Sequence, residues 1–175
     1  MTRGAEASVR VLGIDPGTAV TGWGVVERRA GCVTHLAHGA VTPRTRTTLA
    51  AKLAEIHEAL TELCGAWRPD VLALEQSFVG RNVQSAFRLG EVRGVAMLVA
   101  ATVGIDVAEY PPATVKLAVT GTGRADKEQV QRAIVHELRV GDARMVPDAA
   151  DALAIALCHL HTARLATVLA TVRAR

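Results

Sequence analysis

The chain has 175 residues, which fits one domain with a sizeable core, and half of them are hydrophobic while only 3% are aromatic. Its 20 basic and 17 acidic side chains give a formal net charge of +3, a weak bias toward polyanionic partners. The three cysteines show no C-x-x-C spacing, which argues against a disulfide framework and a structural zinc site and favours a reducing compartment.

The amino-terminal segment is the first feature along the chain. Residues 1–8 are polar and lack the apolar run of a signal peptide, so we expect a poorly ordered extension there. No uninterrupted apolar segment reaches the roughly 20 residues that span a bilayer. Together with the cysteine pattern, these features predict a cytoplasmic protein.

The first predicted element is a buried strand from Val9 to Ile14, directly followed by a carboxylate, Asp15. A Pro-Gly pair then turns the chain, and a second β-prone run over 21–27 follows at hairpin distance. Asp15 either accepts hydrogen bonds from its own turn or needs a cation, because burial removes water from the carboxylate. This segment alone leaves both interpretations open.

Two further strands are predicted around one helix. A third, shorter strand over 31–41 precedes an amphipathic helix over about 49–65, and the run over 71–75 is typical of a central parallel strand. Its last residue, Glu75, is again an acid. A crossover helix brings the ends of parallel strands to the same sheet edge, so Asp15 and Glu75 are expected to lie together. Taken alone, Glu75 could equally be a surface acid.

The next predicted helix runs from about Asn82 to Val103 and carries Gly90 and Gly94 four residues apart. Glycine weakens a helix interior by roughly 1 kcal/mol relative to alanine. This spacing therefore suggests that another backbone packs close, either within the fold or across a dimer.

Shorter elements follow. A parallel strand over 105–110, a short helix over 114–119 and a glycine-rich loop over 120–124 precede a helix over 127–138. Backbone N–H groups at such a helix start can hold a phosphate, although a plain turn explains the loop as well.

The last predicted helix, over 148–157, carries two acids three residues apart, hence on one face. Asp148 could be an N-cap. Asp151 lies one turn further among Ala, Leu and Ile, where a second carboxylate nearby is unfavourable unless a positive group lies between them.

The four carboxylates together predict a metal site. Oxygen ligands without a histidine or cysteine set select a hard cation, Mg²⁺ or Mn²⁺. Such clusters can hold two ions about 4 Å apart, which suits in-line displacement at a phosphodiester.

Motifs in order along the chain support this reading. They are Gly13-Ile14-Asp15-Pro16-Gly17, Thr21-Gly22-Trp23-Gly24, Leu74-Glu75-Gln76 with Phe78 and Asn82, Arg93-Gly94-Val95-Ala96, Val115-Lys116, 127–131, and Asp148-Ala149-Ala150-Asp151-Ala152-Leu153-Ala154. From Val9 to about Thr162 the chain closely resembles the RuvC family of Holliday-junction resolvases.

The resemblance implies an α/β, ribonuclease H-like fold, with a five-stranded mixed β-sheet flanked by α-helices over 9–163 and a basic tail over 164–175. It implies a Mg²⁺-dependent endonuclease, with two ions per subunit and Mn²⁺ as a substitute, that acts in homologous recombination and DNA repair. The enzyme would cut two opposed strands of a four-way junction, leaving 5′-phosphate and 3′-hydroxyl ends.

The resemblance also implies roles for single residues. The catalytic and metal-binding acids fall on Asp15, Glu75, Asp148 and Asp151. Some relatives carry histidine at the position of Asp148, so a scheme with imidazole as base does not transfer. The expected DNA contacts are Phe78, Arg81, Asn82, Lys116, Arg124 and Lys127. The expected homodimer interface includes Val83, Phe87, Gly90 and Gly94. The implied partner is the branch-migration complex of RuvA with RuvB.

Two rival functions remain at this stage. Actin-like phosphotransferases and chaperone ATPases also carry Asp-x-Gly-Thr after a strand, but they need a second similar domain for which this chain has no room. A DNA-binding relative without catalysis is the other alternative, and it would bind junctions without ever cutting them.

Overall fold

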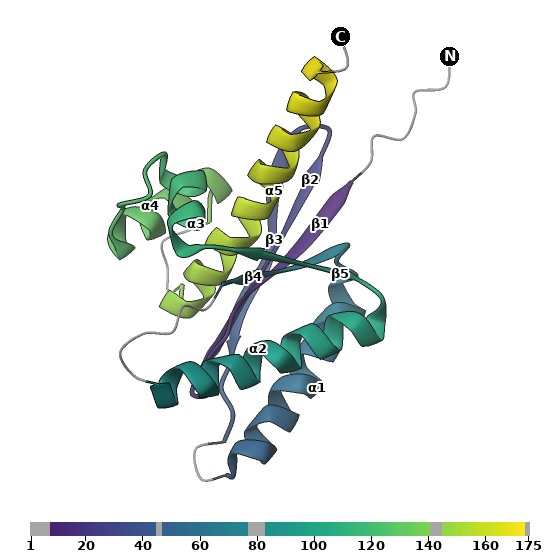
Figure 1. The fold of residues 1–175 in the computed structure, drawn as a ribbon, viewed down its shortest axis with the longest axis vertical. Coiled ribbons are helices and arrows are strands. Elements are labelled where there is room, and N and C mark those ends of the chain that lie inside the picture. The colour runs from purple at the N-terminus through teal and green to yellow at the C-terminus, as the bar shows by residue number, and fades with distance from the viewer. Residues whose placement is uncertain (1–7, 45–46, 77–82, 141–144, 174–175) are drawn as a thin grey trace.

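A computed structural model of the chain describes residues 8–44, 47–76, 83–140 and 145–173 (Figure 1). The elements are β1 (Val9–Asp15), β2 (Thr21–Arg29), β3 (Cys32–Val41), α1 (Leu49–Trp67), β4 (Val71–Glu75), α2 (Val83–Val103), β5 (Asp106–Tyr110), α3 (Pro112–Thr120), α4 (Lys127–Leu138) and α5 (Pro147–Arg173). No helix in these described ranges is long and apolar enough to cross a membrane.

The five strands form one mixed sheet in the order β3-β2-β1-β4-β5. The first three strands are antiparallel neighbours, and β4 and β5 continue the sheet in parallel with β1. The predicted five-stranded mixed sheet is therefore confirmed. The prediction of a shorter third strand is wrong, because β3 has ten residues and pairs along the whole of β2.

One irregularity lets this long pairing continue. Val25 pairs with Ala37 while Val26 pairs with His35, so Leu36 is an extra residue in β3. Such a bulge turns the residues on its two sides toward the same face. The rings of His35 and His38 accordingly meet, with Nε2 of the first 2.8 Å from Nδ1 of the second.

Helices cover both faces of the sheet (Figure 1). On one face α1 and α2 pack over β1 and β4, with Leu12, Ile56 and Val92 in the same buried cluster. On the other face α5 lies across β1 and β2, and α3 and α4 pack beside it. The carboxyl ends of β1 and β4 thereby lie close to residues of α3, α4 and α5.

Glycines on the α5 face of the sheet allow this helix to approach the strands closely. A Cβ added to Gly13 would lie 2.0 Å from the carbonyl oxygen of Ala152, and one added to Gly22 would lie 2.0 Å from that of Asp148. Because any side chain at these positions would collide with backbone, the first turns of α5 rest directly on β1 and β2. This packing fixes where the acids of α5 lie.

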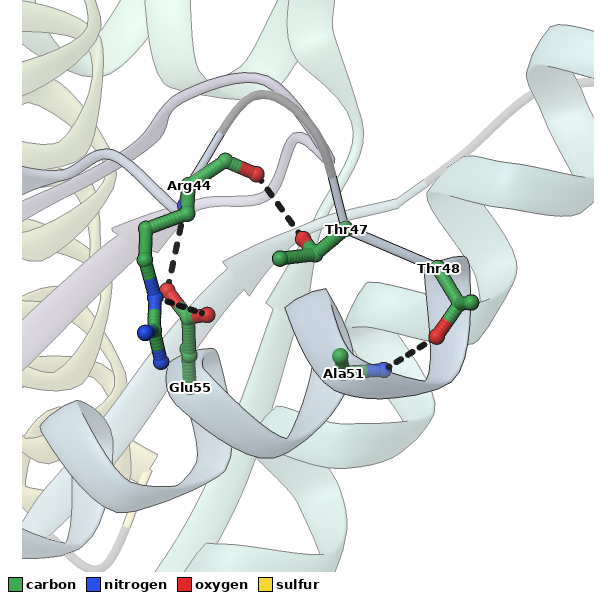
Figure 2. A network of polar contacts seen from close by, with 5 residues as sticks. All are labelled: Arg44, Thr47, Thr48, Ala51 and Glu55. Atoms are coloured by element: carbon green, nitrogen blue, oxygen red, sulfur yellow. Dashed lines mark hydrogen bonds and ion pairs between the residues drawn. The ribbon is translucent and has the colours of Figure 1, made fainter.

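Local contacts define the start and end of α1. Thr48 caps the helix, since its hydroxyl accepts a hydrogen bond of 3.2 Å from the Ala51 N–H, and Arg44 pairs with Glu55 at 2.9 Å (Figure 2). The helix ends at Trp67 rather than near Gly65 as predicted, because Arg68 takes the left-handed conformation with φ of 47°.

The last two helices also differ from the predicted bounds. α3 begins at Pro112 instead of residue 114, because proline lacks only an N–H that the first helical position leaves unpaired. α5 begins at Pro147 and its backbone stays helical to Arg173, well past the predicted end at residue 157. The segment predicted as a tail therefore continues the helix through residue 173.

Candidate active site

Three of the four predicted acids line one pocket at the carboxyl ends of the parallel strands. Asp15 ends β1, Glu75 ends β4, and Asp151 comes from the second turn of α5. Two lysines, Lys116 and Lys127, contribute from α3 and α4. Apolar residues make up the rest of the lining: Pro112, Val115, Val130, Ala154 and Ile155. Residues up to 140 positions apart in the sequence thus meet at one edge of the sheet.

The turn after β1 does not satisfy Asp15. The Thr21 hydroxyl closes this turn by donating to the carbonyl oxygen of Gly17 at 2.7 Å. Within residues 8–44, the Asp15 carboxylate accepts no hydrogen bond from the turn. The interpretation of Asp15 as a self-capped turn residue is therefore wrong.

The charge of Asp15 is instead disfavoured by its surroundings. Burial, followed by the nearby charges of Asp151, Glu75 and Asp148, raises the pKa of Asp15 from 3.8 to about 7, and Lys127 opposes this only in part. Burial is likewise the main cause that raises the pKa of Glu75, and Asp151 adds to it. These carboxylates hold more negative charge than the nearby lysines neutralise.

Asp148 differs from the other three acids. It lies in the first turn of α5, one residue after the helix start at Pro147, and so is not the N-cap. It does not line the pocket, but its charge contributes to the raised pKa of Asp15. Its place beside Gly22 on the sheet keeps it at the edge of the acidic cluster.

Lys127 is the positive partner that Asp151 requires. Its Nζ donates to Oδ2 of Asp151 at 2.7 Å, and this hydrogen bond raises the pKa of Lys127. The lysine is held at the start of α4 because Asp126 and Gln129 form a capping box around it. One ammonium group therefore neutralises Asp151 directly.

The donor chemistry of this pocket fits a hard divalent cation. Three carboxylates with excess negative charge supply only oxygen ligands. Across the described ranges, no three His, Cys, Asp or Glu side chains stand close enough to bind one ion in their present positions. Because Lys127 holds Asp151, a bound cation would have to compete with this ammonium for the carboxylate.

The predicted DNA contacts fall into three groups. Phe78, Arg81 and Asn82 lie outside the described residues. Lys116 and Lys127 line the pocket, and Arg124 is exposed in the turn before α4.

On α2, three of the predicted interface residues, Phe87, Gly90 and Gly94, face solvent. Phe87 is 70% exposed, and a Cβ added to Gly90 or Gly94 would have nothing within 4 Å. The two glycines therefore do not serve close packing within the described fold, which excludes one of the two predicted explanations. The side chain of Val83, the first residue of α2, is outside the described part.

Sequence reasoning missed several residues that shape the pocket. The spacing of two between Gly22 and Gly24 places both on one face of β2 and could have indicated a closely packed helix. The ion pair between Lys127 and Asp151 and the contacts of Arg93 described below join distant segments, and no local pattern indicates them.

The chain is similar to known proteins along most of its length. The family model described as crossover junction endodeoxyribonuclease RuvC matches residues 11–159. The RuvC proteins of Rhodospirillum rubrum and Granulibacter bethesdensis, both crossover junction endodeoxyribonucleases, are each 45% identical to this chain. These two matches cover 95% and 90% of this chain and 98% and 88% of the relatives.

Solved structures give the same result. The Thermus thermophilus RuvC structure superimposes with a TM-score of 0.81 at 33% identity and covers 91% of this chain and 98% of the other. The structure of the same protein in complex with a Holliday junction substrate also gives 0.81, at 30% identity and 90% and 96% coverage. The yeast mitochondrial resolvase Ydc2, at 13% identity and a TM-score of 0.66, shares the fold.

Proposed function

The chain belongs to the RuvC family of crossover junction endodeoxyribonucleases, and from this membership we propose that it resolves Holliday junctions in homologous recombination and DNA repair. The observation that carries the proposal is the pocket in which Asp15, Glu75 and Asp151 converge at the edge of a ribonuclease H-like sheet. The reaction is hydrolysis of two opposed phosphodiesters, which leaves 5′-phosphate and 3′-hydroxyl ends.

The acids of the pocket hold the divalent metal on which catalysis depends. Its ligands are Asp15, Glu75, Asp151 and Asp148. The first three line the pocket, and the charge of Asp148 at its edge reaches Asp15. Two Mg²⁺ ions per subunit, for which Mn²⁺ can substitute, would activate the attacking water and stabilise the leaving oxygen. The raised pKa of Asp15 supports this assignment, because a cation in the pocket would offset both the burial and the like charges that raise it.

The lysines of the pocket act on the substrate. Lys116 and Lys127 neutralise the phosphates that flank the cleaved bond, and the exposed Arg124 extends this basic rim along the DNA backbone. Phe78 stacks on bases near the cleaved bond, and Arg81 and Asn82 contact the backbone of the same DNA strand. The polar loop around Phe78 directly follows Glu75 in the sequence, which supports this placement.

A homodimer supplies the second cut. The exposed side of α2, with Phe87, Gly90, Gly94 and the 58% exposed Leu98, is an apolar strip that a second copy would cover. We assign Val83, from the same helix, to this interface by its position in the sequence. Isologous pairing on this strip presents two equivalent pockets to two equivalent DNA strands.

We place the nuclease domain at residues 9–163, with 1–8 as an extension and 164–175 as a basic tail. The enzyme works in the cytoplasm with the RuvA–RuvB complex.

The test is cleavage of a synthetic four-way junction. The purified chain is incubated with the junction or with duplex DNA of the same sequence, with Mg²⁺, Mn²⁺ or EDTA. We expect paired, symmetric nicks in the junction only, in the presence of metal, and products that DNA ligase can seal. Junction binding without cleavage at any metal concentration would instead identify the non-catalytic relative.

Single substitutions then test the acids. Asp15→Asn keeps the size of the side chain and removes its charge, so junction binding should remain while cleavage falls more than about 100-fold. Asp70→Asn, at the opposite end of the β1–β4 pair, is the matched control and should cut normally. Normal incision by Asp15→Asn would remove Asp15 from the site.

A further inference from the structure

We propose that Arg93 is the positioning residue that sets the place of Glu75 in the pocket. The proposal rests on the metal-binding role of Glu75 proposed above. It concerns a contact between α2 and the end of β4.

Arg93 joins the ends of two parallel strands. Its Nη1 donates to the main-chain carbonyl oxygen of Glu75, and its Nη2 donates to Oε1 of Glu109, the next to last residue of β5. The side chain of Arg93 is only 12% exposed, which favours charge-assisted bonding, while its partner Glu109 is 35% exposed. A planar guanidinium can make both contacts at once in a fixed geometry, which an ammonium cannot do.

Within the described strands, the end of β4 has no further hydrogen bonds from β1. The paired residues of β1 and β4 end at Ile14 and Leu74, and Pro16, just beyond, carries no N–H for a further bond. On the β5 side the Gln76 N–H still donates to the carbonyl oxygen of Tyr110 at 2.8 Å. The end of β4 is therefore held by β5 on one side, and Arg93 donates to the main-chain carbonyl oxygen of Glu75.

This contact makes the position of Glu75 depend on how α2 packs against the sheet. Arg93 lies between the fully buried Val92 and the exposed Gly94, so it reaches inward from the same helix that presents the apolar strip outward. A shift of α2 would move the donor on which the end of β4 depends. The place of Glu75 in the pocket is thus fixed from a helix that does not itself line the pocket.

The alternative is that Arg93 only stabilises the fold. The chain offers a matched control in Arg10, which also bridges a main-chain carbonyl and a carboxylate. Its Nη1 donates to the Trp67 carbonyl, and its Nη2 donates to Oε1 of Glu27 at 2.9 Å. These contacts lie at the amino ends of β1 and β4, away from the pocket.

The experiment measures metal binding without DNA. Mn²⁺ is titrated into the purified full chain, and free Mn²⁺ is followed by its electron paramagnetic resonance signal, for wild type, Glu75→Gln, Arg93→Gln and Arg10→Gln. We expect Glu75→Gln to weaken Mn²⁺ binding more than about 10-fold and Arg93→Gln to weaken it about 10-fold, as for other residues that orient a metal ligand. Arg10→Gln should change it less than about twofold, although both arginine variants lower the Tm.

Arg93→Lys and Arg10→Lys extend the comparison and replace the glutamine pair if that pair does not fold. Arg93→Lys keeps the charge but loses the paired contact, so Mn²⁺ binding should stay at least about threefold weaker than in Arg10→Lys. Equal Mn²⁺ binding in the Arg93 and Arg10 variants would overturn the positioning role. If Glu75→Gln binds Mn²⁺ as tightly as the wild type does, the proposed metal site is wrong.

Discussion

The two ends of the β1–β4 pair use the same kinds of charged residues in opposite ways. At the amino end each described acid has a partner: Glu27 pairs with the Arg10 guanidinium, and Asp70 accepts a 2.7 Å bond from the Arg10 N–H. At the carboxyl end Asp15, Glu75 and Asp151 meet in one pocket, and of these three acids Lys127 bonds to Asp151 alone in the described part of the chain. The amino end stabilises the fold, whereas the carboxyl end holds charges that a bound cation would satisfy.

The pKa values of the acids express this difference. The hydrogen bond from Arg10 lowers the pKa of Glu27, whereas burial and like charges raise that of Asp15 to about 7. A strongly perturbed acid in a pocket is typical of a functional site. Four changes, in order of expected effect, test the comparison.

Gly22→Ala should displace the acids of α5 from the pocket at the carboxyl ends of β1 and β4. Its Cβ would lie 2.0 Å from the Asp148 carbonyl oxygen, so α5 must move away from β2 and carry both of its acids with it. We expect cleavage to fall more than about 100-fold and the free energy of unfolding to fall by about 2 to 4 kcal/mol. Urea denaturation and junction cleavage measure the two effects.

Gly65→Ala is the matched control for this change. A Cβ there would meet nothing within 4 Å, and residue 65 lies in α1, where alanine is favoured over glycine. The control should leave cleavage unchanged and raise stability slightly. Normal cleavage by Gly22→Ala would mean that the contact between α5 and β2 does not fix the acids.

Asp15→Asn should stabilise the metal-free protein at neutral pH. The folded pKa of Asp15 is raised above its ordinary value of 3.8, so its contribution to stability is present below about pH 4 and is lost as pH rises to about 7. The variant, which cannot ionise, should be more stable than wild type by about 2 to 4 kcal/mol at pH 8 in EDTA. Urea denaturation from pH 4 to 8 measures this, and a gain that does not grow with pH would contradict it.

The sequence indicates where the acids lie but not all of the contacts that position them. The strand-helix-strand pattern around Asp15 and Glu75, and the apolar helix around Asp151, place the acids on elements whose ends meet, so the sheet and the acidic edge were predictable. The contact of Arg93 with the Glu75 carbonyl was not, because it joins residues 18 positions apart through tertiary packing alone.

Lys127→Met should separate metal binding from substrate binding. Removing the ammonium frees Asp151 for a cation, so Mn²⁺ binding should tighten about threefold to tenfold. Cleavage of the junction should fall about 10-fold, because a phosphate contact is lost. Lys52→Met, on α1 across the sheet, should change neither quantity, and weaker Mn²⁺ binding in Lys127→Met would show that the ammonium does not compete with the metal.

Glu27→Gln should have the smallest effect and the opposite pH dependence to Asp15→Asn. The pKa of Glu27 is lowered, so its contribution is present above its unfolded value of 4.5 and is lost as pH falls through the folded pKa. At pH 7 the variant should lower the Tm by no more than about 3 °C, because solvent screens the pair. Mn²⁺ binding should match wild type, and a clear loss would mean that the two ends of the sheet are not independent.

The bulge in β3 has a consequence for solubility. The sheet order leaves β3 at an edge, where a regular ten-residue strand would offer unpaired backbone groups to the strands of other molecules. The extra residue at Leu36 breaks the regular spacing of those groups, and the opposite edge strand, β5, has only five residues, including Asp106 and Glu109. The fold therefore resists edge-to-edge aggregation at both margins of the sheet.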